Sequence, residues 1–235
     1  FLPKTKITKD EAKKMINRLK NKGKRFKLSY DGQVLRIINL PKNYKDYPYI
    51  LASFPNSYYE KKMWYTKQRT KNDLTPAKTA KLMSDEDKDL ICEKVKKNLE
   101  LRLNIDYRKS LTSDWKEELS NTYRDTSLNR SLNAYVKAAK ARKIVASSSQ
   151  IVVDPSSLWT DKGGSSCYVR VYTKFRVKSG QVPSAKSSLQ NEVIYGSYTA
   201  LKNLSSKKTV TFMDEIKVNV SYTNGKMTSL SLIHI

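Results

Sequence analysis

The chain has 235 residues, and its 46 lysine and arginine side chains outnumber its 22 acidic ones, which gives a formal net charge of +24. Because 38% of the residues are hydrophobic and recur in ordered periods, a chain that is disordered throughout is excluded; no apolar run approaches the roughly 18 residues of a membrane-spanning helix. Lysine supplies most of the positive charge, which disfavours sequence-specific nucleic-acid recognition by arginine and favours a diffuse anionic polymer.

The positive charge is concentrated at the front of the chain, where residues 1–83 hold 21 basic and six acidic side chains. A solvated basic face and a dedicated anionic partner are both consistent with this excess. The first residue is Phe1, so we expect the chain to start downstream of a removed signal peptide, a purification tag or a further domain.

The front of the chain is predicted to form a small unit of one helix and about four strands. Thr8 and Glu11 form a capping box that opens a short basic helix, which ends at Gly23. Four extended runs follow, in which an Asp-Gly turn joins the first two and a Pro-Asn turn joins the last two. These runs are residues 26–30, 34–38, 47–54 and 58–65. The polar stretch 66–81 ends the unit.

The second half is predicted to begin with three helices. Ser84 is a helix cap, and the acidic residues after it favour the positive end of a helix dipole. Apolar residues then recur every four positions from Ile91 to Leu103, which predicts a buried face on a helix of about five turns. Two more helices are predicted at residues 114–124 and 128–143.

The remainder of the chain alternates between apolar and polar residues, which predicts antiparallel strands with one solvent-facing side. In the strand around residues 169–177, Arg170 belongs to the side expected to face solvent. A second strand spans residues 216–222, and an Asn-Gly turn at Asn224 joins it to the final strand, residues 227–235.

This element order predicts an α+β fold, in which helices pack on a four- to five-stranded antiparallel sheet as in cystatin-like or nuclear-transport-factor-like rolls. We predict two units, a basic α+β unit at residues 1–83 and the roll at residues 84–235. Rolls of this type serve as enzymes, binding modules and dimerisation units, so the fold alone assigns no function.

Tyrosine, tryptophan and lysine alternate between residues 42 and 67, and this pattern supplies the candidate binding residues. Aromatic faces can stack on sugars or bases while the lysines contact phosphates, although a strand would bury half of these aromatics. The candidate residues for an anionic polymer or a sugar are Lys42, Lys45, Tyr49, Tyr59, Lys61, Lys62, Trp64, Tyr65 and Lys67.

The two cysteines, Cys92 and Cys167, leave two interpretations open. If they form a disulfide, they close a loop of about 75 residues, worth about 4–5 kcal/mol in the chain-entropy model. Two unpaired thiols in the core are the alternative.

No catalytic, metal or nucleotide signature is found. A Cys167–His234 dyad would need His234, the only histidine of the chain. A histidine that is hydrogen bonded within the protein or faces solvent is the alternative. The acidic run from Asp85 has the first spacings of a calcium loop, but Leu90 replaces the required glycine and Lys96 the bidentate glutamate. We therefore predict no metal and no cofactor. A carboxylate pair assembled from distant positions would still allow a hydrolase.

Two segments of the sequence resemble a known group of proteins. These are DYPYIL and FPNSYYE within residues 46–60, and NLELRLNIDYR at residues 98–108, which leads to Trp115. They are similar to segments of secreted clostridial proteins that carry a copper amine oxidase N-terminal-like (stalk) domain upstream of an uncharacterised region. The stalk-domain segment itself is absent here, as is any likeness to a topaquinone or copper site. The resemblance implies an extracellular, wall-associated location and no assigned reaction.

These observations favour a non-catalytic, extracellular bacterial protein whose basic front unit contacts an anionic wall polymer or another surface partner. Nucleic-acid binding through the tyrosine- and lysine-rich segment is the first alternative. A hydrolase acting on the cell wall is the second.

Overall fold

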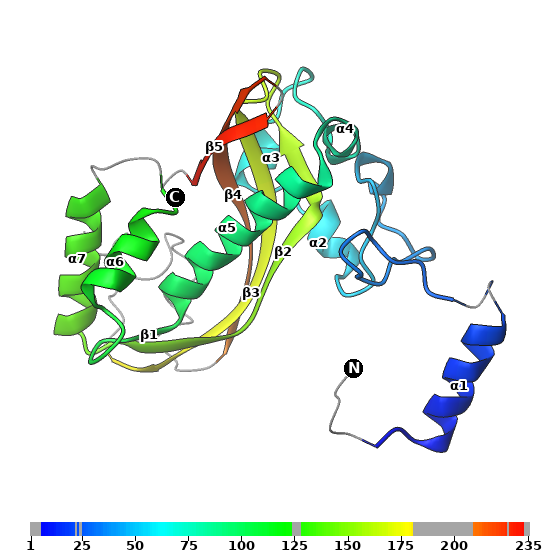
Figure 1. Ribbon diagram of the computed structural model, residues 1–235, viewed down its shortest axis with the longest axis horizontal. Helices are drawn as coiled ribbons and strands as arrows, with labels where there is room; N and C mark the ends of the chain where they lie inside the picture. Colours follow the sequence, from blue (N-terminus) through cyan, green and yellow to red (C-terminus); the bar gives the residue numbers. More distant parts are fainter. Residues whose placement is uncertain are drawn as a thin grey trace.

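The computed structural model describes residues 6–21, 23, 25–123, 128–180, 209–224 and 226–232. His234, and Gly225 of the predicted final turn, lie outside these residues. The described chain has an α+β fold, as predicted, with helices packed on a five-stranded antiparallel sheet whose strands follow one another in chain order (Figure 1). No helix in these ranges is both long and apolar enough to span a bilayer.

The sheet is built around its three long central strands. Its strands are β1 Ile105–Asp106, β2 Val145–Thr160, β3 Ser166–Ser179, β4 Val210–Thr223 and β5 Lys226–Leu232. The predicted alternation in β3 is confirmed on the inner face, where Val169, Val171, Phe175 and Val177 are all completely buried. Because successive strand side chains point to opposite faces, the residues between them must meet whatever covers the outer face.

Three helices supply the core of the inner face: α5 Asp85–Leu103, α6 Ser113–Ser120 and α7 Leu128–Ala141. α5 crosses the sheet, and α6 and α7 lie beyond its C-terminal end (Figure 1). The side-chain oxygen of Ser84 accepts a hydrogen bond from the Asp87 amide at 3.1 Å, so Ser84 caps α5 and the acidic run occupies its first turn, as predicted. The predicted stripe from Ile91 to Leu103 is buried against the inner face.

The front of the chain packs on the outer face of the same sheet from Leu35 onward. Its elements are α1 Lys9–Lys20, the 3₁₀ turn η2 Tyr44–Asp46, α2 Asn56–Glu60, α3 Trp64–Gln68 and α4 Pro76–Leu82. A second hydrophobic cluster, formed by Tyr47, Ile50, Leu51, Phe54, Tyr58 and Tyr59, packs on Val152, Tyr172 and Met213 of the sheet. The sheet is therefore the middle layer between this cluster and the helical core.

Most of the extended structure predicted for the front unit is wrong. Residues 26–54 form no regular strands and contain isolated antiparallel bridges, Leu28 to Val34 and Leu35 to Leu51. The predicted turn at Asp31-Gly32 is present, with Gly32 at a φ of +79°. Residues 58–65 are not a strand, because a helix begins after Pro55 and its first turn closes with the Tyr58 amide donating to the Pro55 carbonyl. Tyr58 and Tyr59 are adjacent in sequence and both are completely buried. Successive side chains of a strand point to opposite faces, so a strand with one solvent-facing side would expose one of the two.

Candidate functional site

Three charged side chains form a row across the outer face of the sheet, beneath α2 and α3. The strand register pairs Arg170 on β3 with Asp154 on β2 and with Glu215 on β4. These three residues, called the charged row below, are 3%, 0% and 1% exposed, respectively. The prediction that Arg170 faces solvent is thus wrong, because the front of the chain packs over this part of the sheet.

Arg170 holds the segment that contains α2 and α3 on the sheet. Its Nη1 donates to the backbone carbonyls of Tyr58 and Tyr59, the latter at 3.1 Å, and its Nη2 donates to the Lys61 carbonyl at 2.9 Å. Nη2 also lies 3.3 Å from the Thr66 hydroxyl oxygen, and Nε lies 3.4 Å from Glu215 Oε1. The guanidinium is therefore fully engaged inside the protein.

Glu215 holds the same segment from the next strand. One of its carboxylate oxygens accepts a hydrogen bond from the Thr66 amide at 2.8 Å, and the other accepts one from the Thr66 hydroxyl. Thr66 lies in α3, so Arg170 and Glu215 together fix α3 and the turn that precedes it. Residues far apart in sequence thereby set the position of Lys61, Lys62 and Lys67.

Asp154, the third member of the row, is a buried carboxyl group with incomplete hydrogen bonding. Its Oδ1 accepts from the Ser156 amide at 2.9 Å and from the Ser156 hydroxyl at 2.6 Å. Its Oδ2 is buried with no hydrogen-bond partner among the described residues. Removal from water raises the pKa of Asp154 to about 6, although the bonds from Ser156 and the charge of Arg170 partly oppose that rise.

An irregularity in β2 directs further side chains toward α3. The pairing of Asp154 with Arg170 is followed by that of Trp159 with Tyr168, so four residues of β2 face a single residue of β3. Within this bulge, the Ser157 hydroxyl accepts a hydrogen bond from the Arg170 amide at 2.8 Å and donates to the Asp154 carbonyl at 2.6 Å. The bulge is therefore a fixed part of the sheet.

Trp159 follows the bulge and is 5% exposed. Its ring stacks on that of Tyr168 with centroids 4.0 Å apart, and the Arg69 guanidinium lies 6.0 Å from its ring centroid. Its indole Nε1 is buried and has no hydrogen-bond partner in the described part of the chain. A buried donor without a partner is energetically unfavourable, so this N–H would gain from an acceptor placed beside it.

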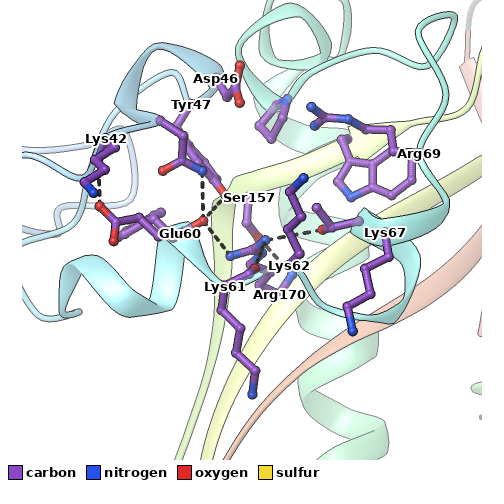
Figure 2. A pocket seen from close by; sticks show the side chains of 15 residues that line it. Lys42, Asp46, Tyr47, Glu60, Lys61, Lys62, Lys67, Arg69, Ser157 and Arg170 are labelled. Atoms are coloured by element: carbon purple, nitrogen blue, oxygen red, sulfur yellow. Dashed lines mark hydrogen bonds between the residues drawn. The ribbon is translucent and has the colours of Figure 1, made fainter.

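These elements enclose a cavity of about 610 Å³, called the basic pocket below (Figure 2). Six basic and two acidic side chains belong to its lining, together with neutral polar and aromatic groups. The lining consists of Lys42, Asn43, Asp46, Tyr47, Tyr59, Glu60, Lys61, Lys62, Thr66, Lys67, Arg69, Pro76, Ser157, Trp159 and Arg170. In Figure 2, Lys62 and Arg69 extend toward the upper part of the pocket, whereas Lys61 and Lys67 extend downward from its rim.

Glu60 and the two tyrosines of the basic pocket are engaged with the protein. Glu60 accepts a hydrogen bond from the Lys42 amide at 2.8 Å, which fixes the backbone at Lys42 against α2. Burial raises the pKa of Tyr47 to about 12, so its hydroxyl stays protonated and donates to the Tyr59 carbonyl at 3.1 Å. The lining lysines, Lys62 among them, are exposed, and Arg69 is half-buried beside the Trp159 ring, so a ligand in the pocket can reach these cations.

Five of the nine residues predicted to bind an anionic polymer or a sugar line the basic pocket: Lys42, Tyr59, Lys61, Lys62 and Lys67. The other four do not. Lys45 is exposed on η2, and Tyr49 is half-buried against the second hydrophobic cluster. Trp64 is 69% exposed, and Tyr65 packs on Tyr168 with centroids 4.9 Å apart.

Sequence reasoning missed ten of the fifteen lining residues of the basic pocket, among them Arg69, Ser157, Trp159 and Arg170. Arg69 lies in a stretch interpreted only as a polar connection. Arg170 follows the alternating pattern of a strand, which cannot reveal that a distant segment covers that side. Ser157 and Trp159 depend on the bulge in β2, for which the run Asp-Pro-Ser-Ser at residues 154–157 was the available signal, since proline disrupts regular strand pairing.

Both cysteines are free thiols in the structure, so the unpaired alternative is the one observed. Burial raises the pKa of Cys167 to about 12 and raises that of Cys92 further. Neither thiol is ionised at neutral pH. Within the described ranges, no three His, Cys, Asp or Glu side chains are grouped to hold a metal ion.

Comparisons with known proteins do not identify the chain. No protein family and no curated protein matches it. Among solved structures, the intermembrane space region of the chloroplast protein ARC6 aligns with 65% of this chain and 98% of its own length, at 12% identity and a TM-score of 0.32. A similarity of this size supports no conclusion about fold or function.

Proposed function

We propose that this chain is a non-catalytic, extracellular bacterial protein that binds an anionic cell-wall polymer in the basic pocket. The supporting observation is the excess of six basic over two acidic side chains around the cavity, where Glu60 already accepts a hydrogen bond from the protein. Lysine is a mobile point charge, which suits the repeated phosphates of a flexible polymer better than directional recognition of one fixed group. The location rests on the resemblance to secreted clostridial proteins.

The neutral part of the basic pocket supports the same ligand class. The unpartnered indole N–H of Trp159 can donate to a phosphate oxygen between Lys62 and Arg69. A cavity of about 610 Å³ falls within the usual range of small-ligand sites, so it can hold one repeat of the polymer.

Nucleic-acid binding is less well supported, because its stacking aromatics are occupied. Tyr59 is buried and Tyr65 packs on Tyr168, which leaves Trp64 as the exposed ring among the four aromatic candidates. A single platform provides little of the stacking on successive bases that single-stranded nucleic acids require.

Binding to poly(glycerol phosphate) tests the proposal. We expect Lys62→Gln/Arg69→Gln to weaken the affinity at least about tenfold at physiological salt, because two charge-assisted contacts are lost. The matched control is Lys137→Gln/Arg176→Gln, which removes the same charge from exposed positions outside the basic pocket and should change the affinity by less than about twofold. Isothermal titration calorimetry of the three proteins measures the difference.

Equal losses in the two double variants would show that overall charge alone causes binding and would contradict the proposal. Single-stranded DNA of matched charge serves as the competing ligand. Tighter binding of DNA than of the wall polymer, with a further loss on Trp64→Ala, would favour the nucleic-acid alternative instead.

A further inference from the structure

α1 presents an apolar stripe that no other part of the described chain covers. None of its residues is buried, and Met15, Ile16 and Leu19 are 43%, 51% and 69% exposed. At 100° per residue these three side chains and Ala12 lie on one side of the helix. Figure 1 shows α1 standing apart from the sheet and the helices that pack on it.

Hydrogen bonds stabilise α1 at both ends. At its start, the Thr8 hydroxyl accepts from the Glu11 amide at 3.2 Å, and Glu11 accepts from the Thr8 amide at 2.8 Å. At its end, Arg25 donates to the carbonyls of Arg18 and Leu19 at 3.2 and 2.8 Å. The helix thus keeps its shape while no described residue covers the stripe.

The edges of the stripe carry basic side chains. Lys9, Lys13 and Lys20 follow one edge by helical geometry, and Arg18 lies with Glu11 on the other. Glu11 is engaged in the capping box, so its carboxylate is already hydrogen bonded. The charge that borders the stripe and remains free for a partner is therefore positive.

An aromatic ring lies beside the same helix. The Arg18 guanidinium lies 4.1 Å from the ring centroid of Phe26, which is 54% exposed. An apolar stripe with basic edges and an aromatic ring close by is the pattern of helices that lie in the surface of a bilayer. The apolar side chains enter the boundary of the acyl chains while the lysines contact anionic headgroups.

We propose that α1 is an interfacial helix that docks the protein on an anionic lipid surface. The charges favour this partner over a second copy of the chain, because pairing two stripes would bring their lysine edges together in a protein of net charge +24. A neutral apolar groove would leave the lysines without partners. This docking is independent of the basic pocket, because α1 contributes no residue to the pocket lining.

Co-sedimentation of the full chain with vesicles tests the docking. We expect binding to vesicles of mixed phosphatidylglycerol and phosphatidylcholine, and little binding to vesicles of phosphatidylcholine alone. Ile16→Gln/Leu19→Gln keeps the charge and the helix propensity of α1 while removing apolar surface, so it should lower the partition coefficient about tenfold or more. The matched control is Leu82→Gln/Leu90→Gln, the same change at exposed leucines of α4 and α5, which should leave partitioning unchanged.

Three outcomes would overturn the docking. They are equal anionic-vesicle binding by Ile16→Gln/Leu19→Gln and wild type, equal binding of wild type to neutral and anionic vesicles, and no vesicle binding at all. Sedimentation equilibrium without lipid tests the alternative that the stripe binds a second copy of the chain. A dimer that Ile16→Gln/Leu19→Gln dissociates would support this alternative and contradict the docking. Lys62→Gln/Arg69→Gln should bind vesicles like wild type, which separates failure of the docking from failure of the basic pocket.

Discussion

Replacing Arg170 with leucine is expected to lower the free energy of unfolding by about 3–5 kcal/mol, because it breaks a buried charged network on one side only. The carboxylates of Asp154 and Glu215 would remain buried without the cation between them. The carbonyls of Tyr58, Tyr59 and Lys61 would also lose their donor. Urea denaturation followed by circular dichroism measures the change.

Arg176→Leu is the matched control for this experiment. Arg176 lies on the same strand and the same side of the sheet as Arg170 but is exposed, so its replacement should change stability by less than about 0.5 kcal/mol. A loss of similar size in both variants would mean that Arg170 does not hold the α2–α3 segment on the sheet. If the account is correct, Arg170→Leu also weakens polymer binding, because that segment carries Lys61, Lys62 and Lys67.

Asp154→Asn is expected to change how stability depends on pH. Because the folded protein raises the pKa of Asp154 from its ordinary 3.8 to about 6, it binds a proton more tightly than the unfolded chain in that interval. Stability is therefore lost as pH rises from 3.8 to 6, and the loss is complete above pH 6. The variant lacks this effect, so its stability relative to wild type should rise by about 3 kcal/mol between about pH 3 and pH 7.

Urea denaturation across that pH range measures the Asp154 effect. The control is Glu117→Gln, which removes an exposed carboxylate of α6 and should follow the wild-type profile within about 0.5 kcal/mol at every pH. Parallel profiles for wild type and Asp154→Asn would show that Asp154 is not a buried carboxyl group in the folded protein. That result would also contradict the enclosure of the charged row beneath the α2–α3 segment.

The second half of the chain was predictable because its signals are local. The repeat from Ile91 to Leu103 and the cap at Ser84 fix α5 from neighbouring residues alone, and the structure places both as expected. Alternation in β3 likewise identified its buried inner face. Patterns with periods of 3.6 and 2 residues need no knowledge of distant contacts.

The front of the chain was less predictable because tertiary contacts determine its conformation. Its tyrosines favour strands in isolation, yet Tyr58 and Tyr59 are enclosed between a loop and the sheet and lie on a short helix. The start of α4 did have a local signal, Thr75 followed by Pro76, since the Thr75 hydroxyl accepts from the Lys78 amide at 3.3 Å.

The basic character of the candidate site was predictable from the sequence, but its position in the fold was not. Lysine enrichment identified Lys42, Lys61, Lys62 and Lys67, which the structure brings to one cavity. Arg170 comes from the other half of the chain, more than 100 positions from the Tyr58 carbonyl that it contacts. No local pattern reports a contact across that separation.

The indole N–H signals of the protein test the proposed pocket most directly. The chain has three tryptophans, and their environments differ: Trp64 is exposed, Trp115 Nε1 donates to the Leu101 carbonyl at 3.1 Å, and Trp159 Nε1 has no partner among the residues that the structure describes. Trp159 lines the basic pocket. In a nuclear magnetic resonance titration with poly(glycerol phosphate), the Trp159 signal should shift until the site is saturated, while the Trp115 signal stays in place. Polymer binding that leaves the Trp159 signal unmoved would contradict the account.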